Sequence, residues 1–172
     1  FSENVFEDYL NQLDPFKRYF YESDIKEFEA FKTQLDDQLK DYDVAFFNLT
    51  HERLLKRIEE SKAIYAEILE KPFDFAKDES YTADYEKLDY VKNKREMKER
   101  WRQQLKFSTI ANYDDAISQR NSDMEANTLP ESVFSAQNEK SSKDEKKSLA
   151  ELEKEAREAT KRSLDELYDF ID

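Results

Sequence analysis

Residues 43–71, DVAFFNLTHERLLKRIEESKAIYAEILEK, decide the fold class of this chain. Apolar side chains recur there every three or four residues, which is the spacing of one face of an α-helix. Pro72 ends this helix, because the residue before a proline avoids the helical backbone conformation. The predicted buried stripe consists of Val44, Phe47, His51, Leu54, Ile58, Tyr65 and Ile68, widened by Phe46, Leu55, Ile64 and Leu69.

The same spacing predicts four further helices, over residues 2–13, about 24–40, 93–119 and 149–171. Asp14 and Pro15 restart the chain after the first helix, with Asp as a cap and Pro at the first helical position. Asn93 with Glu96 is typical of a capping box, and Ser142 with Glu145 is a candidate cap for the last helix. Residues 72–92 have no regular period and many aromatic side chains. We therefore predict an all-α fold, an irregular bundle of about five helices with one loop pinned by aromatic side chains.

The composition excludes several classes of function. The 172 residues include no Gly, no Cys and one His, and the formal net charge is −13. Without Gly there is no P-loop and no dinucleotide-binding fingerprint, and without Cys there is no zinc ribbon. A chain this acidic is not expected to bind nucleic acid. No apolar run approaches the ~20 residues of a membrane span. We therefore expect no metal, no cofactor, no nucleic-acid partner and no transmembrane segment.

No residue is a convincing catalytic candidate. His51-Glu52 begins like a zinc-protease motif, but the fifth residue is Leu55 rather than a second His. The position of His51 on the apolar stripe favours a buried, hydrogen-bonded structural histidine. Arg102 and Lys106 beside Trp101 allow a docking patch, but the favoured interpretation is a helix with its apolar face buried and its cations solvated.

The composition also divides the chain. We predict a helical domain over residues 1–118, a mobile connection over 119–148, and a final helix of the same domain over 149–172. Residues 120–147 should be the least protected against amide exchange, because so few apolar side chains cannot offset the entropy of ordering the backbone. Those side chains are Met124, Leu129, Val133 and Phe134.

Several blocks together resemble the amino-terminal helical region of tail-specific proteases, also called carboxy-terminal processing peptidases. The first is Tyr9-Leu10-Asn11-Gln12-Leu13-Asp14-Pro15, followed by Tyr19-Phe20 and Ser23-Asp24-Ile25. The second is Leu69-Glu70-Lys71-Pro72-Phe73-Asp74-Phe75 and the third is Trp101-Arg102-Gln103-Gln104-Leu105-Lys106, with a weaker fourth at Glu151–Arg157. No block is specific alone; their order and spacing carry the resemblance.

The resemblance implies a bacterial, periplasmic, serine-type endopeptidase as the parent, with a PDZ domain and a Ser/Lys protease core that this chain does not contain. The chain would be its non-catalytic accessory domain, shaping substrate access or docking partners, and its final helix would lead toward the PDZ and protease region. Its partners would be the rest of the parent chain and, through the parent, proteins with apolar carboxy-terminal tails. A free-standing helical binding or adaptor protein is the alternative. The predicted structural anchors are Tyr9, Leu13, Asp14, Pro15, Phe20, Phe73, Asp74, Phe75 and Trp101.

Overall fold

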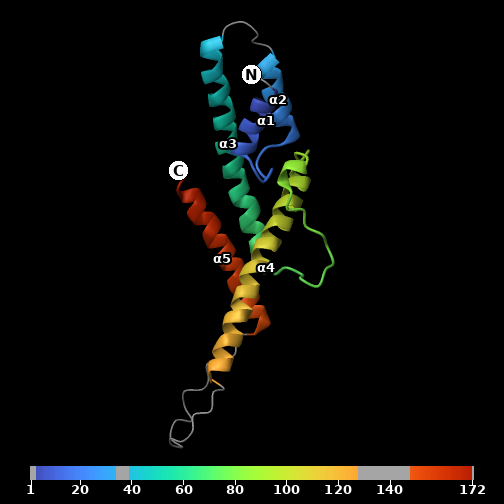
Figure 1. Cartoon of the computed structure of the whole chain (residues 1–172), viewed down its shortest axis with the longest axis vertical. Helices are drawn as coiled ribbons and strands as arrows, with labels where there is room; N and C mark the ends of the chain where they lie inside the picture. The colour runs from blue at the N-terminus through green and yellow to red at the C-terminus, as the bar shows by residue number, and fades with distance from the viewer. Residues whose placement is uncertain (1–2, 34–38, 128–147, 172) are drawn as a thin grey trace, which may run out of the picture. The chain divides into compact units, whose positions relative to one another are not determined.

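The structure, a computed structural model, describes residues 3–33, 39–127 and 148–171. The described residues are 76% helical, and their only extended pairing is an isolated parallel bridge between Tyr21 and Val91. This confirms the predicted all-α class and the expected number of helices (Figure 1). The helices are α1 (Glu3–Leu13), α2 (Glu22–Thr33), α3 (Leu39–Leu69), α4 (Lys94–Asn127) and α5 (Leu149–Asp169), with a short 3-10 helix, η1 (Tyr85–Lys87).

The described chain forms two compact units. Unit 1 comprises residues 1–68 and 79–104, and unit 2 comprises residues 69–78 and 105–172. Helix α4 therefore contributes its first turns to unit 1 and the rest to unit 2. The predicted division at residues 118 and 148 concerns the mobility of a segment, most of which lies outside the described residues, and it stays a prediction.

Helix α4 continues beyond its predicted end at Gln119, to Asn127. The prediction rested on the loss of apolar anchors, but residues 120–127 contain no Gly or Pro to break a helix. Arg, Met, Glu and Ala in this stretch have good helix propensity, and Gln119 Nε2 donates to Asp123 Oδ1 at 3.1 Å. A polar sequence thus sustains the helix without a buried face.

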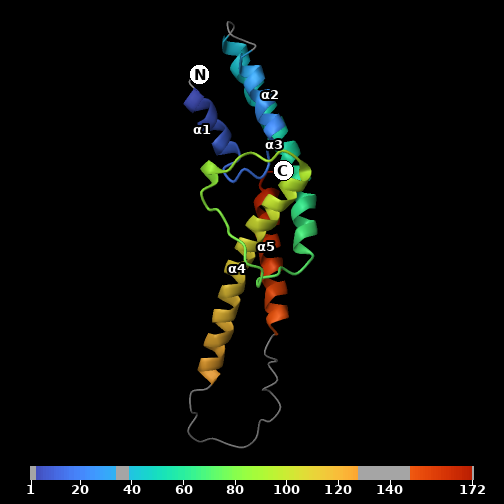
Figure 2. The ribbon, with the colours of Figure 1, turned by 90° about the vertical axis from the view of Figure 1, so that its right-hand side faces the viewer.

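Unit 1 has an aromatic core. Figures 1 and 2 show α1 and α2 lying alongside the first half of α3. The ring centroids of Phe20 and Phe28 are 5.3 Å apart, and those of Phe6 and Phe46 are 5.8 Å apart. Each such ring removes roughly 150–250 Å² from water, so a few rings supply most of the driving force for packing. The fully buried cluster consists of Phe6, Leu10, Phe20, Phe28 and Phe46.

The predicted stripe of α3 is only partly correct. Ile58 and Tyr65 are buried, but Val44 is 60% exposed, Phe47 41% and Leu55 39%. The buried face of the first half includes Phe46, as predicted, and Thr50, which the stripe did not include. The Thr50 hydroxyl donates to the Phe46 carbonyl at 3.1 Å and bonds the Tyr9 hydroxyl at 2.7 Å, so this polar residue is buried without losing hydrogen bonds. Hydropathy alone therefore misplaced several residues of the first half of α3 and missed the buried Thr50.

In unit 2, α5 packs along the second part of α4. The hydroxyls of Thr109 and Thr160 are 3.2 Å apart, and Asn112 Nδ2 donates to Thr160 Oγ1 at 2.9 Å. The cap of α5 is a capping box at Ser148 and Glu151, whereas the predicted cap at Ser142 lies outside the described residues. The buried face of α5 includes Leu152, Ala156, Leu164 and Tyr168.

Candidate functional site

Buried charged side chains are the first candidates for a functional site, because an ion is costly to bury without partners. Asp14, Lys17 and Asp24 are at most 7% exposed in unit 1, and Glu153 and Arg157 at most 8% exposed in unit 2. Their hydrogen bonds show which groups stabilise each buried charge and which parts of the chain each charge holds together.

Asp14 closes the turn that follows α1. Its Oδ1 accepts from the backbone N–H of Arg18 at 2.9 Å, and its Oδ2 accepts from Tyr19 and Phe20 at 3.0 Å each. Burial raises the pKa of the Asp14 carboxyl, although these three N–H groups oppose that shift. Asp14 was predicted to cap a helix beginning at Pro15, but residues 14–20 are not helical and Pro15 is exposed. The turn differs because the carboxylate bonds N–H groups four to six residues ahead, and Lys17 has a φ of 49°.

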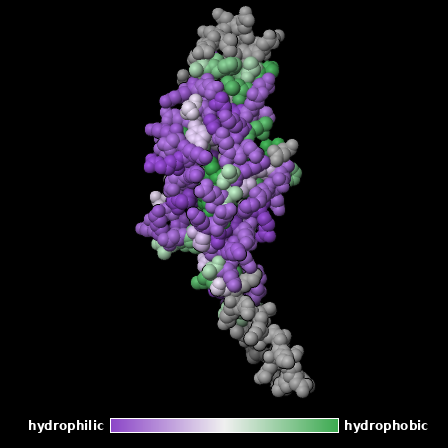
Figure 3. Space-filling model, turned by 180° about the vertical axis from the view of Figure 1, so that it is seen from behind, coloured by the Kyte–Doolittle hydropathy of each residue, from purple (hydrophilic) through white to green (hydrophobic). Residues whose placement is uncertain are grey.

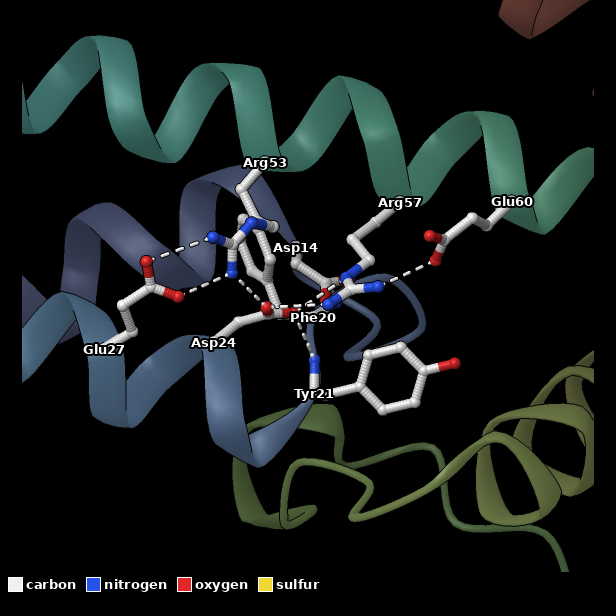
Figure 4. A network of polar contacts seen from close by, with 8 residues as sticks. All are labelled: Asp14, Phe20, Tyr21, Asp24, Glu27, Arg53, Arg57 and Glu60. Carbon is white, nitrogen blue, oxygen red and sulfur yellow. Dashed lines mark hydrogen bonds and ion pairs between the residues drawn. The ribbon is translucent and has the colours of Figure 1, made fainter.

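Asp24 ties α2 to α3 (Figure 4). Arg53 Nη1 donates to Asp24 Oδ1 at 2.5 Å, Arg57 Nη2 donates to the same oxygen at 2.8 Å, and Arg57 Nε donates to Oδ2 at 2.9 Å. The backbone N–H of Tyr21 also donates to Oδ2, at 2.9 Å. Arg53 and Arg57 reach outward to Glu27 and Glu60, respectively. The network therefore crosslinks two helices through one buried carboxylate.

The pKa of Asp24 makes part of this stability dependent on pH. Burial alone would raise the pKa, but the hydrogen bonds from Arg57, Tyr21 and Arg53 outweigh burial and hold the pKa of the carboxyl below its ordinary value. A lowered folded-state pKa gives stability that is present above the unfolded-state pKa of about 3.9 and is lost as the pH falls through and below that value.

We therefore expect Asp24→Asn to destabilise the chain more at pH 7 than at pH 2, because the stability that the ionised carboxylate contributes is lost as the pH falls. The free energy of unfolding measured in urea across this pH range checks the prediction. In an Arg57→Gln background, the effect of Asp24→Asn at pH 7 should shrink, because the two residues share one interaction. An effect that is the same at pH 2 and pH 7 would contradict the assigned network.

Residues 79–91 are fixed to unit 1 by long cationic side chains. Lys17 Nζ donates to the carbonyls of Glu86 and Leu88 at 3.0 and 2.5 Å. Arg100 Nη1 donates to the Lys17 and Asp89 carbonyls at 3.0 and 2.7 Å. Burial lowers the pKa of the Lys17 amine, which donates its hydrogen bonds to neutral carbonyls rather than to a carboxylate. The segment is thus ordered by cations that bind its backbone.

In unit 2, residues 69–74 are held by α4 and α5. Lys106 Nζ donates to the Asp74 carbonyl at 2.6 Å, and Arg157 Nη1 donates to the Leu69 carbonyl at 2.9 Å. Glu153 Oε1 accepts from the Phe73 N–H at 3.1 Å and from Arg157 Nε at 2.8 Å. These three side chains hold the backbone of residues 69–74 in place.

The two cations beside Trp101 are engaged with neighbouring groups: Lys106 is buried, contrary to the favoured interpretation of the sequence, and Arg102 is partly exposed and ion-paired. Lys106 is 6% exposed, and Arg102 donates to Glu79 at 2.7 Å and to Glu99 at 2.6 Å. Each cation has a long flexible stem that lets it reach a neighbouring segment while the helix face stays apolar. Periodicity places such residues on a helix but does not identify their partners.

The predicted anchors fall into both units. In unit 1, Phe20 and Trp101 are fully buried, Tyr9 and Leu13 are half-buried, and Trp101 Nε1 donates to the Arg18 carbonyl at 2.8 Å. In unit 2, the half-buried rings of Phe73 and Phe75 stack at 6.3 Å. Asp74 is exposed, and its Oδ1 accepts from the Ala76 N–H at 3.0 Å. The structure thus brings Trp101 against Arg18, Tyr19 and Tyr65 and places Phe73 and Phe75 in a separate cluster with Tyr113.

Sequence reasoning missed Asp24, Arg53 and Arg57 as one network. The available signal was the spacing of the two arginines, because residues four apart on a helix share a face. Asp24 was identified only as a candidate helix cap, and nothing in the sequence paired it with α3. The packing of α2 against α3 supplies that information.

His51 is exposed, which contradicts the prediction of a buried structural histidine. It lies on the same side of α3 as Val44, Phe47 and Leu55, and this face is not covered in unit 1. Figure 3 shows a largely hydrophilic surface in which hydrophobic side chains form small groups. The exposed large apolar side chains of unit 1 include Val5, Phe16, Val44, Phe47 and Leu55, and those of unit 2 include Leu149, Leu167, Phe170 and Ile171.

Within residues 3–33, 39–127 and 148–171, no group of three or more His, Cys, Asp or Glu side chains is arranged to hold a metal ion. None of the helices in these ranges is both long enough and apolar enough to cross a membrane.

These observations define an all-helical domain whose buried charges hold its own turns and loops in place. A family model of the tail-specific protease N-terminal domain matches residues 1–169. The chain belongs to this family of N-terminal domains, and the resemblance predicted from the sequence blocks is confirmed.

Proposed function

We propose that the chain is the non-catalytic accessory domain of a serine-type carboxy-terminal processing endopeptidase in the periplasm. The observation that carries this proposal is the family match over nearly the whole chain. The use of buried charges supports it: the groups of Asp14, Asp24, Lys17 and Glu153 are all engaged with backbone or with arginine partners. A catalytic group would need an open position facing a substrate.

The second part of the proposal is that the domain docks on the rest of the parent chain and shapes substrate access. The uncovered face of α3 supports this part, because Val44 and Phe47 are exposed apolar side chains on one side of the helix, and neighbouring exposed apolar side chains mark interaction sites. Burial of such a face in a larger chain would remove apolar area from water. The parent would then act on proteins with apolar carboxy-terminal tails.

The reading frame beyond Asp172 gives a first test. A following PDZ domain and a Ser/Lys protease core would support the proposal, whereas an immediate stop codon would favour the free-standing binding or adaptor protein. This observation tests the parent's architecture and not the role of the α3 face.

The role of that face is tested in the full-length parent with the double change Val44→Ser and Phe47→Ser. We expect slower cleavage of a protein with an apolar tail, with the helical circular dichroism unchanged, because the change removes exposed apolar area. The Phe47 ring also meets the Tyr9 ring edge-on at 5.1 Å, so thermal unfolding of the variant is measured alongside cleavage. The matched control is Leu167→Ser with Phe170→Ser on α5, which removes similar exposed apolar area in unit 2. Equal cleavage by the α3 variant and the wild type would refute docking through α3.

A further inference from the structure

A groove of about 810 Å³ lies beside the first turns of α4 in unit 1. Part of its lining is apolar and consists of the half-buried side chains of Ile68 and Tyr90 and the buried Val91. The rest of the lining consists mainly of charged side chains from residues 89–102. The groove therefore combines an apolar area with a charged wall.

The stretch that forms this wall is basic in an acidic chain. Residues 92–102 contain six Lys or Arg and two Glu, a net charge of +4, whereas the whole chain carries a formal net charge of −13. The cations that line the groove are Lys92, Arg95, Lys98, Arg100 and Arg102. A local excess of positive charge attracts anionic ligands.

Three of these five cations are engaged within unit 1, and two are free. Arg100 donates to backbone carbonyls, and Arg102 and Lys98 are paired with glutamates. Lys92 and Arg95 are exposed, and neither side chain makes a hydrogen bond or an ion pair with any residue in the described ranges. These two cations are therefore available to a ligand.

The acids near these cations are engaged with other groups. Glu96 Oε2 accepts a backbone N–H at 2.7 Å, and Glu99 Oε1 accepts an arginine N–H at 2.6 Å. The charge of Asp89 acts on two cations that bind the backbone of residues 79–91. The charge of Glu22 acts on Lys92, but Glu22 is paired at 3.0 Å with a lysine of its own helix.

The position of the free cations is unfavourable for α4 itself. This helix begins at Lys94, so Lys92, Lys94 and Arg95 surround its N-terminal end. The unpaired N–H groups of a helix N-terminus carry partial positive charge, which makes cations there unfavourable. Helix stability therefore does not explain this cluster, whereas an acidic ligand would offset the charge of both the cations and the helix end.

We propose that the groove binds an acidic, extended segment of a partner protein. Carboxylates of the segment pair with Lys92 and Arg95, and the guanidinium of Arg95 can donate two parallel bonds to one carboxylate. An apolar side chain of the segment lies against Ile68 and Tyr90. The site lies in unit 1 and does not depend on the proposed role in a protease.

An acidic peptide fits this groove better than a nucleic acid or an anionic membrane does. Both of those present dense phosphate charge, which the acids of a chain with a net charge of −13 repel strongly. Glu96 and Glu99 also line the groove and oppose a dense polyanion. A peptide carries fewer charges, and its apolar side chains match the apolar part of the lining.

Fluorescence anisotropy of labelled peptides measures binding to the 172-residue chain. The first peptide is two glutamates, a leucine and two glutamates, with both ends blocked. The second has glutamine in place of each glutamate, and the third has serine in place of the leucine. We expect saturable binding of the first peptide at low salt, binding about tenfold weaker or less for the second, and severalfold weaker binding for the third. High salt should weaken binding of the first peptide, because exposed charges are screened.

The double change Lys92→Gln with Arg95→Gln should weaken binding of the first peptide by about tenfold or more, since it removes both free cations. The matched control is Lys154→Gln with Arg162→Gln on α5, which removes one exposed Lys and one exposed Arg in unit 2 and should leave binding unchanged. The melting temperature of the groove variant should equal or exceed that of the wild type, because two cations are removed from a helix N-terminus.

Three results would overturn the proposal: no response to millimolar amounts of the first peptide, equal affinity for the glutamate and glutamine peptides, or equal affinity of the groove and control variants. Equal affinity for the leucine and serine peptides would refute the apolar contact. Tighter binding of a short single-stranded DNA or of anionic lipid vesicles than of the first peptide would assign the groove to a phosphate-bearing ligand instead. A dimer in sedimentation velocity that the groove variant does not form would identify a second copy of the chain as the occupant and refute the separate partner.

Discussion

Trp101→Ala should lower the free energy of unfolding by about 3–5 kcal/mol, the range expected when a large buried aromatic side chain is truncated. Trp101 is 0% exposed, and its ring centroid lies 6.0 Å from that of Tyr19 and 5.9 Å from that of Tyr65. The change also leaves the Arg18 carbonyl without its indole donor. Thermal and urea unfolding followed by circular dichroism measure the effect.

Two control variants test the contributions of the ring volume and of its burial. Trp101→Phe keeps most of the apolar volume and should cost less than Trp101→Ala. Phe170→Ala removes a ring that is 93% exposed and should change the stability by less than about 0.5 kcal/mol. An unchanged melting temperature of the Trp101→Ala variant would show that the buried ring of Trp101 does not anchor unit 1.

Asp14→Ala should destabilise the chain by a similar amount, about 3–5 kcal/mol. The reason differs: the change leaves the backbone N–H groups of Arg18, Tyr19 and Phe20 without their acceptor, and each unsatisfied buried donor costs about 1–3 kcal/mol. Water that enters the turn recovers part of this cost, so the total stays below the sum of three separate losses. Chemical unfolding of the 172-residue chain provides the measurement.

Asp74→Ala is the matched control for this turn. Asp74 also accepts a backbone N–H, from Ala76, but it is exposed and water replaces the lost bond. Its substitution should cost less than about 1 kcal/mol. If the Asp14 and Asp74 variants lose the same stability, burial of the acceptor is not the reason that Asp14 matters.

The sequence predicted the helices well because helical periodicity is a local property. Pro72 and the Asn93–Glu96 pair marked element ends correctly: α3 ends at Leu69, and Glu96 N–H donates to Asn93 Oδ1 at 2.9 Å. The face of α3 that packs could not be predicted in this way. Thr50 is buried through partners on its own helix and on α1, whereas Val44 is exposed, so side-chain hydropathy and burial disagree at both positions.

The polar networks were the least predictable part of the candidate site. Asp14 lies in a block that identified the family, but its three backbone partners depend on the left-handed conformation of Lys17. Lys17 reaches carbonyls about 70 residues away in sequence, and Arg157 reaches the carbonyl of Leu69 across an even longer separation. Such partners are set by tertiary packing, and a single sequence contains no pattern that pairs them.

The way in which α5 is attached has a consequence for the integrity of unit 2. Glu153 and Arg157 bind the backbone of residues 69–73, and Thr160 meets Thr109, so side chains hold this helix in place on two sides. Ser148 and Glu151 satisfy its first backbone groups from within the helix itself. These noncovalent contacts hold α5 in place in addition to its covalent connection to α4. A protease that cut this connection would produce a nicked chain whose two fragments remain associated. A denaturing gel would separate the two fragments, whereas size-exclusion chromatography under native conditions would show a single species of unchanged size.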